Sequence, residues 1–342
     1  MKLQNDFHPP TCPIKGILFG QDPQLVQQIW GAEQRARLHC LVDLPPEILT
    51  PSQMQEHADW LSQTEVVFST WSMPLLSPEQ LDLMPRLKAV FYAGGTVKGF
   101  AEPLFDRGIL VVSGWAANAI PVAEYTLSQI LFSLKQGWRH VRQLQGDPAG
   151  WKRLPSTGAY QATVGIISLG MVGRKVCELL QPFSLRKLIY DPFVQDAALS
   201  ELGGARAGLK ELFANSDVVT LHTPWLKETE GMITGELFAS MKPNATFINT
   251  SRGAVVQENE MVEVLQNRPD LTAILDVTHP EPPEPDSPLY HMPNVVLTPH
   301  IAGAQGNEFL RLADWMMDEF VTWQKGQPLR YAVLPELMSK SA

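Results

Sequence analysis

The sequence predicts an α/β protein with two domains, each a doubly wound parallel β-sheet covered by helices on both faces. Three observations lead to this prediction. The chain has 342 residues, more than one ordinary hydrophobic core accommodates. Short, continuously apolar segments alternate with segments of helical spacing, which is typical of parallel strands buried on both sides. The alternation is interrupted once and resumes at a glycine-rich turn, so we expect two separate sheets.

The first series contains four predicted strands with helical segments between them. The strands are 16–20, 65–69, 88–92 and 109–113, and the clearest helices are 23–38 and 78–84. A long helix from 118 to about 138 and the polar loop "QGDPAGWKRLPSTG" then interrupt the pattern.

The second series begins at "TVGIISLG". Its six predicted strands are 164–168, 187–191, 217–221, 245–249, 272–276 and 295–297. Six strands with helices between them suit a doubly wound nucleotide-binding sheet. A last helix, 308–324, follows. Two long helices around the second series suggest that it is inserted into the first domain, which the C-terminus completes.

Composition limits the partners. The net charge of −9 argues against nucleic acid, because binding to phosphates needs an excess of cations. Three cysteines without CxxC spacing favour reduced thiols. The N-terminus "MKLQNDFHPP" has no apolar signal region, and no apolar run reaches the ~18–20 residues of a membrane span. We therefore expect a cytoplasmic protein with neither a nucleic-acid nor a membrane partner.

The turn "SLGMVG" matches the GxGxxG pattern of dinucleotide sites at its second and third positions, Gly170 and Gly173. Gly170 would let the backbone approach a pyrophosphate, and Gly173 would let helix and strand pack closely. The first position is Ser168, whose Cβ the turn must tolerate. Asp191 follows Gly173 by 18 residues, close to the spacing expected of an acid that accepts ribose hydroxyls. This acid repels a 2′-phosphate and no arginine follows closely, so NAD is predicted and NADP is less favoured.

Charged residues follow three further strands at the carboxyl edge, where such sheets bind ligands. Arg252 can hold a carboxylate with two hydrogen bonds, and His300 can exchange a proton with a carbonyl oxygen or an alcohol. A carboxylate such as Glu281 would orient the imidazole. Each has an ordinary alternative: a structural histidine, a surface salt bridge or a solvated loop. The nearby group of His279, Glu281, Glu284 and His291 lacks metal-ligand spacing, so no metal site is predicted.

The chain resembles the D-isomer-specific 2-hydroxyacid dehydrogenases from about residue 75 to 316. The motifs are "NAIPVAEYTLSQIL", "GIISLGMVG", "DVVTLHTPWLKETEGMI", "MKPNATFINTSRGAVV", "ILDVTHPEP" and "PNVVLTPHIAG". The resemblance implies a discontinuous flavodoxin-like substrate domain, 1–117 and 304–342, around an inserted Rossmann NAD domain, 118–303. It also implies a homodimer with contacts through the NAD domain, at the arm 147–153 and the helix after Pro121.

The resemblance further assigns roles to residues. It implies Arg252 as the substrate-binding arginine, Glu281 as the paired carboxylate and His300 as the acid/base. Backbone N–H groups of Gly94 and Gly95 would bind the substrate carboxylate. The cofactor would lie along Leu169, Gly170, Met171, Val172, Asp191, Thr223, Thr250, Ser251, Arg252, Asp276, His300 and Gly303, with Asp276 near the carboxamide.

The expected activity is therefore NAD-dependent hydride transfer between NAD(H) and a small D-2-hydroxy or 2-oxo acid, of the glyoxylate or hydroxypyruvate kind. Two alternatives stay open. One is an NAD-sensing scaffold similar to the C-terminal-binding-protein corepressors, which bind NADH and a peptide. The other is a phosphite-type dehydrogenase, which shares the three charged groups. Glu281 argues against formate dehydrogenase, which carries an amide there.

Overall fold

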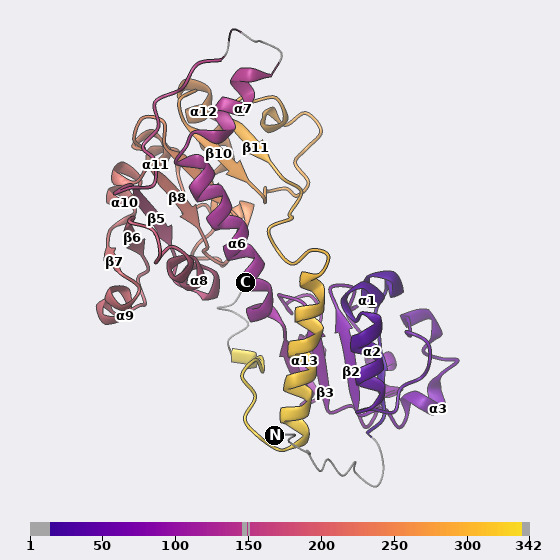
Figure 1. Cartoon of the computed structure of the whole chain (residues 1–342). Coiled ribbons are helices and arrows are strands. Elements are labelled where there is room, and N and C mark those ends of the chain that lie inside the picture. Colours follow the sequence, from indigo (N-terminus) through magenta and orange to yellow (C-terminus); the bar gives the residue numbers. More distant parts are fainter. Residues whose placement is uncertain (1–13, 146–148, 150, 337–342) are drawn as a thin grey trace. The chain divides into compact units, whose positions relative to one another are not determined.

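The computed structural model describes residues 14–145, 149 and 151–336, which divide into two compact units (Figure 1). One unit comprises the described residues up to Asn118 together with those from Gln305 onward, and the other spans Ala119–Ala304. Each is built on a parallel sheet with helices on both faces, so the predicted α/β class is correct. The assignment of one unit to substrate and the other to cofactor stays a prediction.

The first unit has a four-stranded parallel sheet in the order β1-β2-β3-β4. The strands are β1 (Gly16–Leu18), β2 (Val66–Thr70), β3 (Ala89–Ala93) and β4 (Leu110–Ser113). Parallel bridges from Lys15 to Asp43 and from Phe19 to Leu49 place a further segment on the free edge of β1. The chain therefore winds outward in both directions from β1, as in a flavodoxin-like sheet.

Helices cover both faces of this sheet. On one face, α1 (Pro23–Ile29), α2 (Ala32–His39) and α13 (Glu308–Gln324) lie together, and α13 packs against β3. The rings of Phe68 and Phe91 each meet Phe320 of α13 edge-on, with centroids 5.2 and 5.3 Å apart. The other face buries side chains of α3 (Ala58–Leu61), α4 (Pro78–Asp82) and α5 (Glu102–Asp106). The C-terminal helix is thus part of the core that the N-terminal strands begin.

The second unit has a seven-stranded parallel sheet in the order β11-β10-β9-β8-β5-β6-β7. The strands are β5 (Thr163–Ile167), β6 (Arg186–Tyr190), β7 (Gly204–Arg206), β8 (Val218–Leu221), β9 (Thr246–Asn249), β10 (Thr272–Leu275) and β11 (Val295–Leu297). The chain moves outward from β5 to β7 and then crosses back to β8. The direction of winding therefore reverses between β5 and β8, where sheets of this kind bind ligands at their carboxyl ends.

The helices of the second unit form two layers. On one face, α6 (Trp115–Ser133) and α8 (Met171–Leu179) bury Ala123, Ile130 and Val176. The opposite face is covered by α10 (Leu209–Asn215), α11 (Gly235–Ala239) and α12 (Glu258–Asn267). Further elements complete the unit: α7 (Gly137–Leu144), α9 (Asp196–Glu201), and the 3-10 turns η3 (Gly253–Val255) and η4 (Pro288–Tyr290). A further 3-10 turn, η1 (Pro51–Gln53), belongs to the first unit.

Three predicted elements were wrong in detail. The helix 23–38 is two helices, α1 and α2, separated at Trp30 and Gly31, where a Cβ on Gly31 would lie 2.7 Å from Leu310. The helix predicted over 118–138 begins earlier, at Trp115, and ends earlier, at Ser133. It does not continue into α7, because Gln136 between them adopts a left-handed conformation, φ 55°. The second sheet has seven strands rather than six. The additional strand, β7, has only three residues at the sheet edge, too few for an apolar pattern.

In the described parts of the chain, no helix has both the length and the apolar character needed to cross a membrane. Cys40 is exposed and Cys177 is buried, and both are free thiols. Cys12 and residues 147, 148 and 150 of the predicted arm lie outside the described residues.

Candidate active site

An imidazole–carboxylate pair lies on the loops that follow β10 and β11. His300 Nδ1 is 2.6 Å from Glu281 Oε1, and both side chains are partly exposed. Because Nδ1 is held by the carboxylate, Nε2 is the ring nitrogen left to face a ligand. The structure therefore brings together two of the residues that the sequence marked for acid/base chemistry.

The backbone at His300 is in the left-handed region, with φ 55°. Such a conformation costs a non-glycine residue on the order of 1 kcal/mol and persists only where neighbouring contacts fix it. Asp276, which is buried, supplies these contacts. Its carboxylate accepts hydrogen bonds from Thr298 Oγ1 at 2.6 Å, from the Ile301 amide at 2.8 Å and from the Ala302 amide at 2.9 Å. Asp276 was predicted to lie near the cofactor carboxamide, and in the structure its carboxylate holds the turn that carries His300.

Tyr125 of α6 contributes to this turn and was not predicted. Its hydroxyl lies 3.0 Å from Thr298 Oγ1. Since the Thr298 proton is donated to Asp276, Tyr125 must be the donor in this contact. Burial is the main factor that raises the pKa of Tyr125, so it remains a protonated donor at neutral pH.

Arg252 follows β9 and precedes η3. Asn249 fixes this turn, because its side chain accepts from the Ser251 amide at 3.0 Å and donates to the Arg252 carbonyl at 3.1 Å. Arg252 Nη1 donates to the Ser251 carbonyl at 2.6 Å. Burial lowers the pKa of the Arg252 guanidinium, and the negative charge of Glu281 opposes that effect. The charge of Glu281 thus reaches Arg252, while the same carboxylate contacts His300.

A cavity of about 420 Å³ adjoins this site. Its wall includes Asp276, Thr278, Glu281, Thr298 and His300. Space for a small ligand therefore exists beside the imidazole–carboxylate pair.

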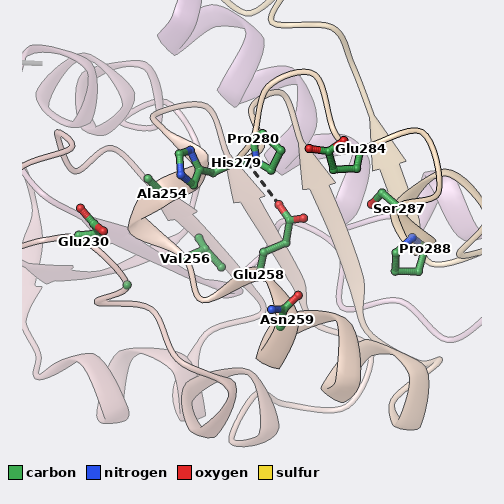
Figure 2. A pocket seen from close by; sticks show the side chains of 11 residues that line it. Glu230, Ala254, Val256, Glu258, Asn259, His279, Pro280, Glu284, Ser287 and Pro288 are labelled. Carbon is green, nitrogen blue, oxygen red and sulfur yellow. Dashed lines mark hydrogen bonds between the residues drawn. The ribbon is translucent and has the colours of Figure 1, made fainter.

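A second cavity, of about 480 Å³, is lined by His279 and Pro280 but by none of the three catalytic candidates (Figure 2). The carboxylates of Glu230, Glu258 and Glu284 line it, and Glu258 accepts a hydrogen bond from the His279 amide at 3.3 Å. Burial raises the pKa of Glu258. Among the residues that the structure describes, no three His, Cys, Asp or Glu side chains are grouped so that they could hold a metal ion.

The glycine turn between β5 and α8 suits a dinucleotide. A Cβ on Gly170 would meet nothing within 4 Å, so the space beside this backbone is open. A Cβ on Gly173 would lie 2.0 Å from the Ser168 carbonyl oxygen, so only glycine permits this helix–strand contact. Gly170 caps α8 without a side-chain hydrogen bond, which leaves the first amides of the helix to an anion. These residues fit a bound pyrophosphate.

Asp191, the predicted ribose ligand, is buried and already well bonded. It accepts hydrogen bonds from the amides of Leu169 at 2.8 Å, Phe193 at 2.9 Å and Val194 at 3.1 Å. A carboxylate has about four acceptor positions, so roughly one remains for a ribose hydroxyl. Asp191 therefore fixes the glycine turn against its own loop and leaves limited capacity for the cofactor.

Arg206 is a second residue that the sequence did not suggest. It lies on β7, and its guanidinium donates to the carbonyl oxygens of Asp191, at 2.7 Å, and Val194, and to Asp196 at 2.6 Å. No arginine follows Asp191 closely in the sequence, but the fold places Arg206, on the edge strand β7, beside it.

The other predicted ligand residues occupy the expected edges. In the first unit, Gly94 N already donates to the Tyr92 carbonyl at 2.9 Å, which leaves Gly95 as the better candidate for a substrate carboxylate. In the second unit, the remaining cofactor candidates follow β5, β8, β9 and β11 at the carboxyl edge. They are Leu169, Met171, Val172, Thr223, Thr250, Ser251 and Gly303.

His222, directly after β8, was also not predicted. Its Nε2 lies 3.1 Å from Thr220 Oγ1, whereas its buried Nδ1 has no hydrogen-bond partner among the described residues. Burial lowers the pKa of His222 to about 3 from an ordinary value of 6.5. The imidazole is therefore neutral in the folded protein at physiological pH.

This burial predicts a pH dependence of stability. Between pH 6.5 and about 3, the unfolded chain binds a proton at His222 that the folded chain does not. The contribution of neutral His222 to the free energy of unfolding is therefore fully present above pH 6.5. It decreases as the pH falls below 6.5, by up to ~1.4 kcal/mol per pH unit. In His222→Gln, the free energy of unfolding measured by urea denaturation from pH 7 to 5 should fall less steeply than in the native protein. Equal slopes would contradict this role.

Comparisons with known proteins find relatives of this chain in sequence and in fold. The model of the D-isomer specific 2-hydroxyacid dehydrogenase, NAD binding domain, matches residues 127–302, about half of the chain. A D-3-phosphoglycerate dehydrogenase of Archaeoglobus fulgidus is 34% identical over 268 residues, which cover 78% of this chain and 51% of that protein.

Solved structures share the fold. The NAD-complexed D-isomer specific 2-hydroxyacid dehydrogenase of Lactobacillus delbrueckii ssp. bulgaricus aligns with a TM-score of 0.78 and 22% identity, over 93% of this chain and 100% of that one. A phosphoglycerate oxidoreductase from Rhizobium etli aligns with a TM-score of 0.77 and 24% identity, over 95% and 99% of the two chains. At these identities the likeness concerns the fold alone. The chain spans about half the length of the phosphoglycerate dehydrogenases that it matches.

Proposed function

The chain belongs to the D-isomer specific 2-hydroxyacid dehydrogenase family, and we propose that it reduces a small 2-oxo acid to a D-2-hydroxy acid with NADH, or catalyses the reverse reaction. The observation that supports this most is the His300–Glu281 pair, 2.6 Å apart, with Arg252 within electrostatic reach of the same carboxylate. An imidazole for proton transfer and a guanidinium for a carboxylate are the groups that 2-oxo acid reduction needs.

Bound NADH supplies the hydride, which leaves proton transfer and charge stabilisation to side chains of this protein. His300 Nε2 gives a proton to the carbonyl oxygen as negative charge develops there, and Glu281 stabilises the imidazolium. Arg252 holds the substrate carboxylate and stabilises the developing alkoxide. Asp276, through its contacts with Thr298 and two amides, keeps the His300 turn in place. In the direction of oxidation, His300 accepts the proton instead.

The glycine turn and Asp191 hold the dinucleotide in this proposal, and NAD is preferred to NADP. The support is the negative charge of Asp191, which would repel a 2′-phosphate on a ribose bound beside it. Arg206 does not offset this charge freely, because three of its N–H groups are bonded to the loop and to Asp196.

The substrate and cofactor can be tested together by following NADH and NADPH absorbance with a panel of acids. The panel is glyoxylate, hydroxypyruvate, pyruvate, 2-oxoisocaproate and 3-phosphohydroxypyruvate, with phosphite in the oxidative direction. We expect glyoxylate and hydroxypyruvate to be reduced best, and NADPH to be used at least about tenfold less well, as an unfavourable charge contact of ~1.4 kcal/mol implies.

Other outcomes have definite meanings. Preference for 3-phosphohydroxypyruvate would indicate a phosphorylated substrate, in agreement with the relatives named D-3-phosphoglycerate dehydrogenase. Oxidation of phosphite alone would identify the phosphite-type alternative. NADH binding without turnover of any compound would contradict the proposal and favour the scaffold alternative.

The assembly is proposed to be a homodimer, and the location cytoplasmic. Phe132 of α6 and Val141 and Leu144 of α7 are about 40% exposed, which is consistent with a contact through the helix after Pro121. Sedimentation velocity tests this assignment, and a single species with the mass of one chain would contradict it.

A further inference from the structure

Ser168 occupies a backbone position that normally favours glycine. It lies at the carboxyl end of β5, at the first position of the glycine turn, with φ 72°. This conformation is in the left-handed region, where a side chain costs on the order of 1–2 kcal/mol. The turn would form with less strain around glycine, so the serine side chain should have a compensating contact.

That contact is with Thr223. Ser168 Oγ lies 2.8 Å from Thr223 Oγ1, and the two residues follow β5 and β8, the neighbouring strands between which the winding reverses. The hydroxyl pair therefore spans the point of the sheet edge where a dinucleotide is expected to cross.

The two hydroxyls have two protons, and the hydrogen bond between them uses one. Thr223 is 3% exposed, whereas Ser168 is only half-buried. A buried donor must be satisfied within the protein, which favours donation from Thr223 to Ser168. In this arrangement the proton of Ser168 remains available on the more open side, next to the uncapped N-terminus of α8.

We propose that the Ser168 hydroxyl, polarised by Thr223, donates a hydrogen bond to the pyrophosphate of the bound dinucleotide. This inference rests on the proposed NAD-dependent function. It gives the departure from glycine a role: the strain at Ser168 is retained because the hydroxyl adds a contact that glycine cannot make. A hydrogen bond to a charged phosphate is stronger than one between neutral groups, so its loss should be measurable in cofactor affinity.

The test is equilibrium binding of NADH and ADP-ribose, followed by fluorescence and calorimetry, to the full chain and its variants. Ser168→Ala and Ser168→Gly should both bind the two ligands about tenfold more weakly, which corresponds to ~1.4 kcal/mol. Binding of adenosine, which has no phosphate, should not change. Ser168→Gly removes the strain as well as the hydroxyl, so it should melt at a higher temperature than Ser168→Ala.

A double-mutant cycle isolates the hydroxyl pair. Thr223→Val should weaken NADH binding by less than Ser168→Ala, and the double variant should bind no worse than Ser168→Ala alone. The matched control is Ser240→Ala, which should bind as the native protein does. The Ser240 hydroxyl donates to the Leu237 carbonyl of the adjoining helix, at 2.7 Å, away from the glycine turn.

The contrary results are distinct. If Ser168→Gly binds NADH as tightly as the native protein, Ser168 is only a strained substitute for glycine and the inference fails alone. If the native protein binds neither NADH nor ADP-ribose, the inference and the proposed function both fail. If it binds them but reduces no acid, the proposed activity fails while the Ser168 comparison stands.

Discussion

Replacement of His300 by asparagine is expected to lower kcat/KM for 2-oxo acid reduction by ~10³-fold, within the range of general acid–base catalysis, while NADH binding persists. Glu281 holds Nδ1 at 2.6 Å, so Nε2 is the ring nitrogen that can give the proton. Asparagine is the suitable replacement, because it tolerates the left-handed backbone at this position, φ 55°, better than most residues. The change thus removes the proton donor with little damage to the turn.

Steady-state rates with NADH and NADH fluorescence titrations measure these two effects separately. His291→Asn is the matched control, because His291 is an exposed residue outside the proposed site and its replacement should leave kcat/KM unchanged. Glu281→Gln should cause a smaller loss than His300→Asn, since an amide can still accept from the ring but carries no charge. Turnover of His300→Asn within a few-fold of the native rate would remove His300 from the mechanism.

The fold could be predicted from the sequence wherever a segment has a strong pattern of its own. The helix Glu308–Gln324 and the strand Val295–Leu297 have the predicted bounds. The helix buries its apolar side chains, and the partly buried apolar side chains of the strand pack against the core of the second unit, so both carry a recognisable pattern. Gly31 is a local sign of the break between α1 and α2, but the tertiary contact that accompanies it, the close approach of Gly31 to Leu310, could not be predicted from the sequence.

The residues of the candidate site were likewise predictable only in part. The glycine turn, Arg252 and His300 could be proposed because each is marked by its residue type at or just after the end of a strand, and Glu281 because it lies in the proline-rich loop that follows another strand. The supporting contacts could not, because they join residues far apart in the sequence. Tyr125 meets Thr298 across 173 positions, and Ser168 meets Thr223 across 55. The role of Asp276 could not be determined from its residue type. In the structure, its carboxylate accepts hydrogen bonds from the turn that carries His300.

Replacement of Arg252 by alanine is expected to remove most turnover, with kcat reduced by ~10²–10³-fold and KM for the acid increased, while NADH still binds. The guanidinium is partly buried, which lowers its pKa, and it lies within reach of the Glu281 charge. A charge in such an environment interacts more strongly with a substrate carboxylate than it would in water. The loss should therefore exceed that of an exposed ion pair.

The variant Arg252→Lys separates charge from geometry. Lysine keeps the positive charge but lacks the planar pair of donors that holds a carboxylate in two hydrogen bonds. We therefore expect Arg252→Lys to recover less than a tenth of the native kcat/KM, in rates measured with the best acid of the panel. Full recovery by lysine would show that charge alone is sufficient. Near-native turnover of Arg252→Ala with every acid would mean that the substrate carboxylate is held elsewhere, and the assignment of Arg252 would be wrong.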